Sequence, residues 1–403
     1  MLYYAQDRFI DEFSKLTPYS EIGKKFLYQH ECKRHPLSRL LREKKFFIYP
    51  LFIGSNRFFL GPMPTLPDNV IHTVKSGCGA VVFFYFNEGS VYKEIQIKLL
   101  EGWSKEQGFT SKNVYFINSN LLLENIKSKY ITFKSFNFFE ASVWHFEETN
   151  RNVPQSITNK INQINAIEYK HKEYYFNCLN RASRSPRIFL VSLLKAYKEI
   201  DSKCLLSLGN KSFKTNSYNL NDIPYNNTSI TDENDLQQVK RFVDKEFKNI
   251  KENGITLDQP DLKKINTHKV NFNIYNNSYI SIISETEYIP NVMFFTEKTF
   301  RSISIKQPFF LIGNRYSLDH LKSLGYKTFD RWWDESYDTL EDVYDRTYSA
   351  FKEIKKISKL DKNSLYCMIK EMEEVLNHNF YHFFNNHRHS EFFNFLKNIN
   401  GSI

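Results

Sequence analysis

The chain has 403 residues, of which 41% are hydrophobic and 16% aromatic, so it is longer than one hydrophobic core usually organises and too apolar to be intrinsically disordered. Lysine and arginine exceed aspartate and glutamate by 55 to 45, and the resulting net charge of +10 is compatible with a nucleotide, a nucleic acid or an anionic membrane surface as partner. Lysine-rich and asparagine-rich codon usage would produce the same charge without any such partner.

The first part of the chain predicts a Rossmann-like domain. Residues 1–45 carry apolar side chains at helical spacing and predict helices. After them, continuous apolar stretches alternate with amphipathic stretches, which indicates a parallel sheet covered on both faces. The predicted strands are 46–53, 79–86, 113–118 and 131–136, and the predicted helices are about 67–75, 92–108 and 120–129.

The second part of the chain repeats this alternation. A polar stretch at 147–162 indicates a domain boundary, and an asparagine-rich insert at 210–232 indicates a surface loop. The predicted strands are 173–180, 204–209, 279–285, 308–313 and 327–330, and the predicted helices are 188–200, 233–251, 317–325 and three more up to the carboxyl end. We therefore expect an α/β protein with two Rossmann-like domains facing a cleft, at 1–160 and 165–375. For a terminal helix in 376–403, packing back on the first domain is one possibility.

Several site types are disfavoured by what the sequence lacks. Neither half carries the Gly-x-Gly-x-x-Gly turn of nicotinamide dehydrogenases or a Walker lysine motif. The five cysteines are widely spaced without a CxxC pair, which argues against a disulfide framework and a zinc site. His378 and His382 have the i, i+4 spacing of a zinc ligand pair, but no further ligand pattern accompanies them. We expect no metal site and no bound cofactor.

The sequence also predicts a cytoplasmic protein. No stretch reaches the roughly 18 uninterrupted apolar residues of a membrane span, and the amino terminus lacks the order of a signal peptide. We therefore expect no integral membrane association. The sequence leaves the oligomeric state open.

The stretch "TEKTFRSISIKQ" carries the most specific chemistry. It follows a predicted strand and opens a helix, with Thr296 as a cap, so it would present the backbone donors of a helix amino terminus to an anion. Lys298 can neutralise a diphosphate, and Glu297 can accept hydrogen bonds from two ribose hydroxyls. The alternative is an exposed ion pair at an ordinary helix start.

This region resembles the donor-binding core of the α-1,3-fucosyltransferases. That family has a strand into Phe-Glu-Asn-Ser, then Tyr-x-Thr-Glu-Lys, a helix and a Pro-Val-Val-x-Gly strand. Here "SIISETEY" and "FFTEKTFRSISIKQPFFLIG" supply Glu285, the Thr-Glu-Lys triplet, Pro308 and Gly313. Thr286 stands in place of the asparagine, and Phe294 in place of the tyrosine near the base and ribose. The resemblance covers about residues 281–313.

The resemblance implies the two-domain glycosyltransferase B fold and transfer with inversion and without a metal ion. It implies that Glu297 holds the ribose, Lys298 holds the phosphates and Glu285 lies near the sugar. Phe294 would lie near the base. The donor would be a nucleoside diphosphate sugar linked through UDP or GDP.

Two further elements complete the predicted site. "NRASRSPR" follows the first strand of the second domain, so Arg181, Arg184 and Arg187 would reach phosphate oxygens from a strand-to-helix turn. Arg181 is favoured, followed by Arg184, because they lie nearest the strand end; the alternative is that these arginines merely solvate a helix start. Glu88, after an apolar strand of the first domain, is the candidate catalytic base, although a surface-loop glutamate is the common alternative.

The sequence thus predicts a glycosyltransferase that acts on a glycan or on a hydroxymethylated DNA base. A DNA base would be reached by base flipping. The alternative hypothesis is a non-catalytic nucleic-acid-binding protein on a Rossmann-like scaffold, for which salt-dependent DNA affinity without nucleotide-sugar binding would be diagnostic.

Overall fold

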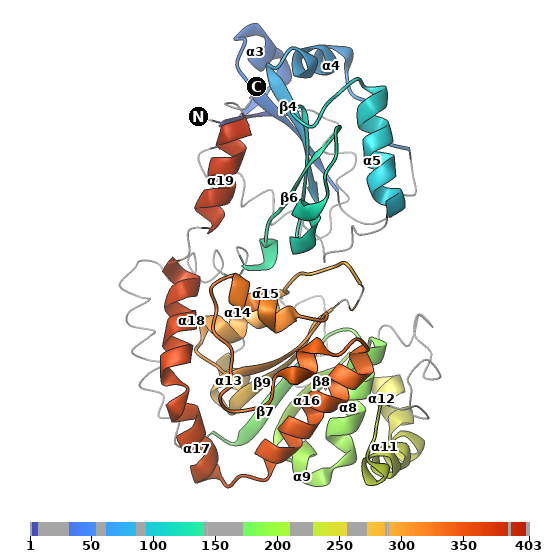
Figure 1. The fold of residues 1–403 in the computed structure, drawn as a ribbon, viewed down its shortest axis with the longest axis vertical. Coiled ribbons are helices and arrows are strands. Elements are labelled where there is room, and N and C mark those ends of the chain that lie inside the picture. The colour runs from blue at the N-terminus through green and yellow to red at the C-terminus, as the bar shows by residue number, and fades with distance from the viewer. Residues whose placement is uncertain are drawn as a thin grey trace. The chain divides into compact units, whose positions relative to one another are not determined.

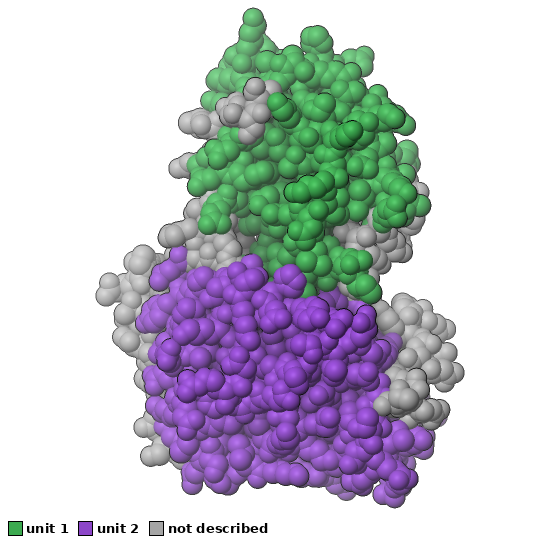
Figure 2. Space-filling model, viewed as in Figure 1, with its two compact units in different colours: residues 1–145, 289–295, 386–403 green, residues 146–288, 296–385 purple. Residues whose placement is uncertain are grey.

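The computed structural model divides into two compact units, which Figure 2 colours separately. Unit 1 comprises residues 1–145, 289–295 and 386–403, and unit 2 comprises 146–288 and 296–385. The first segment of unit 1 therefore ends before the predicted boundary at 160, and two later segments join it. The structure describes residues 2–6, 32–53, 62–85, 94–140, 143, 172–209, 229–255, 272–286, 288, 290–385 and 388–399.

Unit 1 contains a six-stranded parallel sheet with the order β2-β1-β3-β4-β5-β6 (Figure 1). Its strands are β1 (Leu2–Gln6), β2 (Cys32–Pro36), β3 (Phe47–Phe52), β4 (Gly79–Tyr85), β5 (Val114–Asn118) and β6 (Thr132–Ser135). The last four confirm the predicted strands. The expectation of helices throughout residues 1–45 is wrong for β1 and β2, which are defined by pairing with each other and, through β1, with β3.

Alternate residues of this sheet face two helical layers. One set, including Tyr49, Val81 and Phe116, packs with residues of α4 (Asp68–Lys75) and α5 (Glu94–Glu106). The other set, including Ile48 and Val82, packs with α19 (Arg388–Asn398), which lies on the opposite side of the sheet from α5 in Figure 1. Both faces are therefore covered, as the continuous apolar strands predict.

The remaining elements of unit 1 are short. They are α3 (Leu37–Arg42) and the 3-10 helix η2 (Leu121–Asn125). The helix predicted over 120–129 is thus shortened to this single element. The terminal segment 376–403 is split: residues up to Asn385 belong to unit 2, and α19 belongs to unit 1.

Unit 2 contains a four-stranded parallel sheet with the order β10-β9-β7-β8. Its strands are β7 (Tyr174–Asn180), β8 (Cys204–Leu208), β9 (Ser278–Ser284) and β10 (Phe309–Ile312), all of which were predicted. Every residue of β9 and β10 is buried, so both faces of these strands are covered.

No strand forms at 327–330, where the sequence predicts one. The Phe329 ring is buried against Phe309 and Trp333. The backbone amides of Lys327 and Phe329 donate to the Asn379 and Glu335 side chains at 2.7 and 2.8 Å. Side-chain acceptors thus satisfy the amides that a sheet neighbour would otherwise pair.

The helices of unit 2 pack in two groups. Helix α8 contacts α11 and α16, and α14 contacts α18 (Figure 1). None of the described helices is long and apolar enough to cross a membrane. The bounds are α8 (Ser185–Ala196), α9 (Lys198–Asp201), α11 (Glu233–Lys245), α12 (Phe247–Asn253), α13 (Phe272–Asn276), α14 (Glu297–Ser304), α15 (Ser317–Ser323), η5 (Ser336–Thr339), α16 (Val343–Ser358), α17 (Lys362–Glu371) and α18 (Glu373–Asn385).

The strand order of unit 2 creates a topological switch point. From β7 the chain proceeds to β8 on one side, and it later returns to β9 on the other side of β7, followed by β10. In open parallel sheets the loops after two such strands diverge, and ligands bind in the crevice that this leaves at their carboxyl ends. The loops that begin at Arg181 and Glu285 leave β7 and β9 at this point.

Candidate functional site

Helix α14 begins at the carboxyl edge of the unit 2 sheet and is held there by Glu285. Thr296 is its N-cap, as predicted, and its Oγ1 accepts from the Lys298 amide at 3.4 Å. Oε1 of Glu285 accepts from the Thr296 amide at 3.0 Å and from the Thr299 hydroxyl at 2.9 Å. Glu285 Oε2 is buried and has no hydrogen-bond partner among the described residues. One carboxylate oxygen therefore holds the helix, and the other is available to a ligand.

This arrangement corrects one sequence-based expectation. The amides at the start of α14 were expected to bind an anionic ligand, but those of Thr296 and Lys298 bond within the chain. A carboxylate at a helix amino terminus is stabilised by the helix dipole, so Glu285 occupies part of the place expected for a phosphate.

Glu297 and Lys298 do not form an exposed surface ion pair. Their side chains are 12% and 16% exposed, and Lys298 Nζ lies 3.7 Å from Glu297 Oε1. Lys298 Nζ also donates to Thr296 Oγ1 at 3.3 Å. Charges that are largely removed from water interact with each other and with a ligand more strongly than solvated charges do. The pair therefore combines an ammonium donor and a carboxylate acceptor in a largely desolvated place.

The three arginines after β7 lie in different environments. Arg181 is exposed, and Arg184 is half-buried and donates to the backbone carbonyl of Thr286. Arg187 is only 2% exposed and donates to Ser284 O and Thr286 Oγ1, both at 3.1 Å. Arg184 and Arg187 thus reach from the β7–α8 turn to the end of β9, across the switch point.

Arg187 carries a buried charge that the described residues do not neutralise. It forms no ion pair with any carboxylate among them, and its Nε has no hydrogen-bond partner. Burying an unpaired charge costs several kcal/mol even after relaxation, so a buried guanidinium without a counter-ion is unusual. A bound anion would supply the missing partner.

Other buried polar atoms at the same strand ends also lack partners. They are Ser183 Oγ, in the turn after β7, and Asn180 Oδ1, at the last residue of β7. Native proteins leave few such atoms unsatisfied, and ordered water or a polar ligand commonly supplies the missing partner. Together with Glu285 Oε2 and Arg187 Nε, these atoms define the candidate site.

Tyr288 adds a hydroxyl donor near this edge. Its hydroxyl lies 2.5 Å from Ser284 Oγ and donates to Ile312 O at 3.5 Å. Burial raises the pKa of Tyr288 to about 12, so the hydroxyl keeps its proton at neutral pH. Tyr288 therefore ties the ends of β9 and β10 together.

One predicted site residue is buried in the core of unit 1, and another lies outside the described residues. Phe294 is 3% exposed, belongs to unit 1 and packs with Phe139 and Val292, so its ring has little surface left for a nucleotide. Glu88 lies outside the described residues. The described residues contain no group of three or more His, Cys, Asp and Glu side chains that could hold a metal ion. His378 and His382 bond instead to the carbonyls of Gly325 and Leu324.

Sequence reasoning underestimated Arg187. It ranked the arginines by closeness to the strand end, whereas Arg187 opens a stretch of α8, residues 187–194, in which every residue is buried. Arg187 lies three residues after Arg184, and this helical spacing was the available signal. The use of a single Glu285 oxygen by two donors of α14 had no signal in the sequence.

No protein-family model matches the chain, and comparison with curated proteins and with solved structures gives no significant match. The function of the protein must therefore be inferred from the geometry of this site and from the resemblance of its motif.

Proposed function

We propose that this protein is a glycosyltransferase that moves a sugar from a nucleoside diphosphate sugar to an acceptor hydroxyl. The observation that carries the proposal is the Arg187 guanidinium at the switch point of unit 2, which is buried and forms no ion pair with a described carboxylate. Lys298 and Glu297 start a helix at the same edge of the sheet. Positive charge for a diphosphate and a carboxylate for ribose hydroxyls are thus available together.

Each residue has a proposed role. Lys298 and Arg184 bind the diphosphate, with Arg187 behind them as a buried positive charge. Glu297 accepts from the ribose hydroxyls, and Glu285 Oε2 accepts from a hydroxyl of the sugar. Arg181 is exposed and has at most a steering role, because a solvated charge is screened.

The reaction follows from these roles. The acceptor oxygen attacks the anomeric carbon, the bond from that carbon to the diphosphate oxygen breaks, and the diphosphate leaves with the electron pair. Cationic side chains stabilise the charge that develops on the leaving group. The acceptor proton passes to a general base, for which Glu88 is the proposal. Attack opposite the leaving group would invert the anomeric centre, and a B-type two-domain glycosyltransferase fold without a metal ion is part of the same proposal.

The proposed acceptors are a glycan and a hydroxymethylated DNA base, and a cytoplasmic location suits both. The net charge of +10 would favour approach to DNA, but it favours any anion equally. Transfer assays with radiolabelled UDP- and GDP-sugars on hydroxymethylated DNA and on oligosaccharides would distinguish the two.

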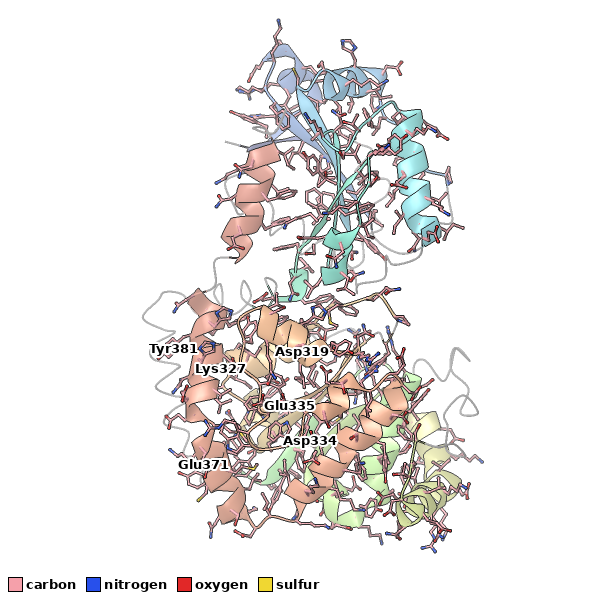
Figure 3. All side chains as sticks on the ribbon, viewed as in Figure 1. Asp319, Lys327, Asp334, Glu335, Glu371 and Tyr381 are labelled. Carbon is pink, nitrogen blue, oxygen red and sulfur yellow. The ribbon has the colours of Figure 1, made fainter. Side chains whose placement is uncertain are left out.

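The proposal is tested first by thermal unfolding with UDP and GDP. A ligand at about 100 times its dissociation constant stabilises by about 2.7 kcal/mol, which for a unit of 150–250 residues raises the midpoint by about 5–10 °C. We expect Lys298→Ala to remove this increase. Lys327→Ala is the matched control, because Lys327, labelled in Figure 3, is a surface lysine whose side chain forms an exposed ion pair with Glu374 at 2.8 Å.

Two results would count against the proposal. One is the absence of any nucleotide effect on the wild-type midpoint. The other is an increase that Lys298→Ala and Lys327→Ala retain equally. Salt-dependent binding to unmodified DNA without a nucleotide effect would instead favour the nucleic-acid-binding alternative.

A further inference from the structure

The turn after β10 packs directly against Glu285. A Cβ atom added to Gly313 would lie 3.6 Å from Glu285 Cγ and 2.6 Å from Ser317 Oγ, so the backbone approaches closely here. The Gly313 carbonyl accepts from Arg346 Nε at 3.1 Å. Three residues further on, Tyr316 lies within about 11 Å of Gly313, the greatest span of three residues.

Tyr316 combines exposure with an unfavourable backbone conformation. Its φ and ψ of 66° and 23° are left-handed, a region that residues other than glycine seldom occupy. The residue is 41% exposed, one of the exposed large hydrophobic side chains of unit 2. Residues held in such conformations persist only where the surroundings determine them, and they are concentrated at ligand sites.

The surroundings of Tyr316 hold it firmly. Its amide donates to Asp338 O at 2.9 Å, and the Arg315 guanidinium carbon lies 4.7 Å from the centre of its ring. Arg315 is itself fixed by Thr339 O at 2.6 Å and Glu341 Oε2 at 2.9 Å. An exposed aromatic ring with a guanidinium against one face and a cross-linked backbone is ordered before any ligand arrives.

Two buried side chains, those of Asp338 and Arg346, hold the segment around Tyr316 in place. Asp338 accepts from the amides of Ser317 and Leu318 at 3.2 and 2.8 Å. Arg346 Nη1 donates to the carbonyls of Leu340 and Glu341 at 2.6 and 2.8 Å. These bonds join the start of α15 to the loop that follows η5, so Tyr316 has a rigid support.

We propose that Tyr316 is the platform on which the base of the donor nucleotide stacks. This inference rests on the proposed function, because it assumes a nucleotide at the carboxyl edge of the unit 2 sheet. A base needs a flat apolar surface, and aromatic side chains supply it with little dependence on base identity. Phe294, which the motif resemblance places near the base, is buried against Phe139 and Val292, whereas Tyr316 supplies an exposed ring in the turn after β10, the strand paired with β9.

Calorimetric titration of the full-length protein with UDP, GDP and inorganic pyrophosphate tests this role. We expect Tyr316→Ala to weaken UDP or GDP binding about tenfold, equivalent to about 1.4 kcal/mol, and to leave pyrophosphate binding unchanged. Tyr316→Phe should bind like the wild type, because the ring is retained. Tyr381→Ala is the matched control, because Tyr381 is 48% exposed on α18 (Figure 3).

The outcomes separate this inference from the proposed function. If the wild type binds neither nucleotide, both are overturned. If it binds a nucleotide and Tyr316→Ala binds that nucleotide equally well, the stacking role is overturned and the proposed function stands. If Tyr316→Ala weakens pyrophosphate and nucleotide alike, the substitution disturbs the turn rather than the base contact, and the stacking role is again overturned.

Discussion

Glu285 offers a sharp test, because its two carboxylate oxygens have different surroundings. Glu285→Ala would leave the Thr296 amide and the Thr299 hydroxyl without their acceptor, and both residues are fully buried. Each unsatisfied buried donor costs about 1–3 kcal/mol, so the expected loss of unfolding free energy is about 2–6 kcal/mol. Glu285→Gln keeps one oxygen for both donors. It loses the stronger bonding of a charged acceptor and its attraction to the helix dipole, together about 1–2 kcal/mol.

Urea denaturation of the three proteins measures these differences. The free energy of unfolding of Glu285→Ala should be clearly lower than that of Glu285→Gln. Equal stability of the two variants would refute the structural role of Oε1. Ligand-binding measurements test the role of Oε2. In Glu285→Gln an amide group that donates replaces the oxygen that accepts, so binding of the nucleotide sugar should weaken while binding of the free nucleotide persists. A loss of free-nucleotide binding in this well-folded variant would contradict the assignment of Oε2 to the sugar.

Two further predictions concern buried charges. Arg187→Met removes a buried charge that no described carboxylate neutralises, and it also removes three hydrogen bonds. Because these effects oppose each other, the free energy of unfolding without ligand should change by less than about 2 kcal/mol. The rise in thermal midpoint that the nucleotide causes should disappear. A retained rise would contradict the role of Arg187. Burial raises the pKa of Asp338 from 3.8 to about 7, so the folded state binds a proton that the unfolded chain has lost between these pH values. The free energy of unfolding should therefore fall by at most about 4 kcal/mol as pH rises from about 4 to 7 and stay constant above pH 7. In Asp338→Asn, denaturation at a series of pH values should show no such fall. The same pH dependence in both proteins would contradict this prediction.

Much of the fold was predictable because the signals are local. Eight of the strands were predicted from short stretches rich in apolar residues between turns, and the start of α14 follows from the threonine before Glu297 and Lys298. Burial on both faces demands apolar residues at every position of a strand, and an N-cap demands a hydroxyl or carboxamide oxygen at one position. Such requirements are met by neighbouring residues, so they can be read without knowing the fold.

Other features depend on residues far apart in the chain. Strand β2 lacks an apolar run, and both β1 and β2 are defined by pairing with each other and, through β1, with β3. The apparent strand at 327–330 is satisfied instead by side chains such as Asn379. Phe294 occupies a motif position that predicts a site residue, but its ring is buried against Phe139.

The sequence by itself determined two parallel α/β units and a helix that begins with an adjacent carboxylate and ammonium. Three features came from the tertiary structure alone: Arg187 is buried at the switch point, Glu285 uses one oxygen to hold α14, and Tyr316 is exposed on a rigid turn. These features depend on which groups surround a side chain in the folded protein, because burial and missing hydrogen-bond partners are set by those neighbours. At the switch point the neighbours come from β7, β9 and β10, which lie far apart in the sequence and adjacent in the sheet.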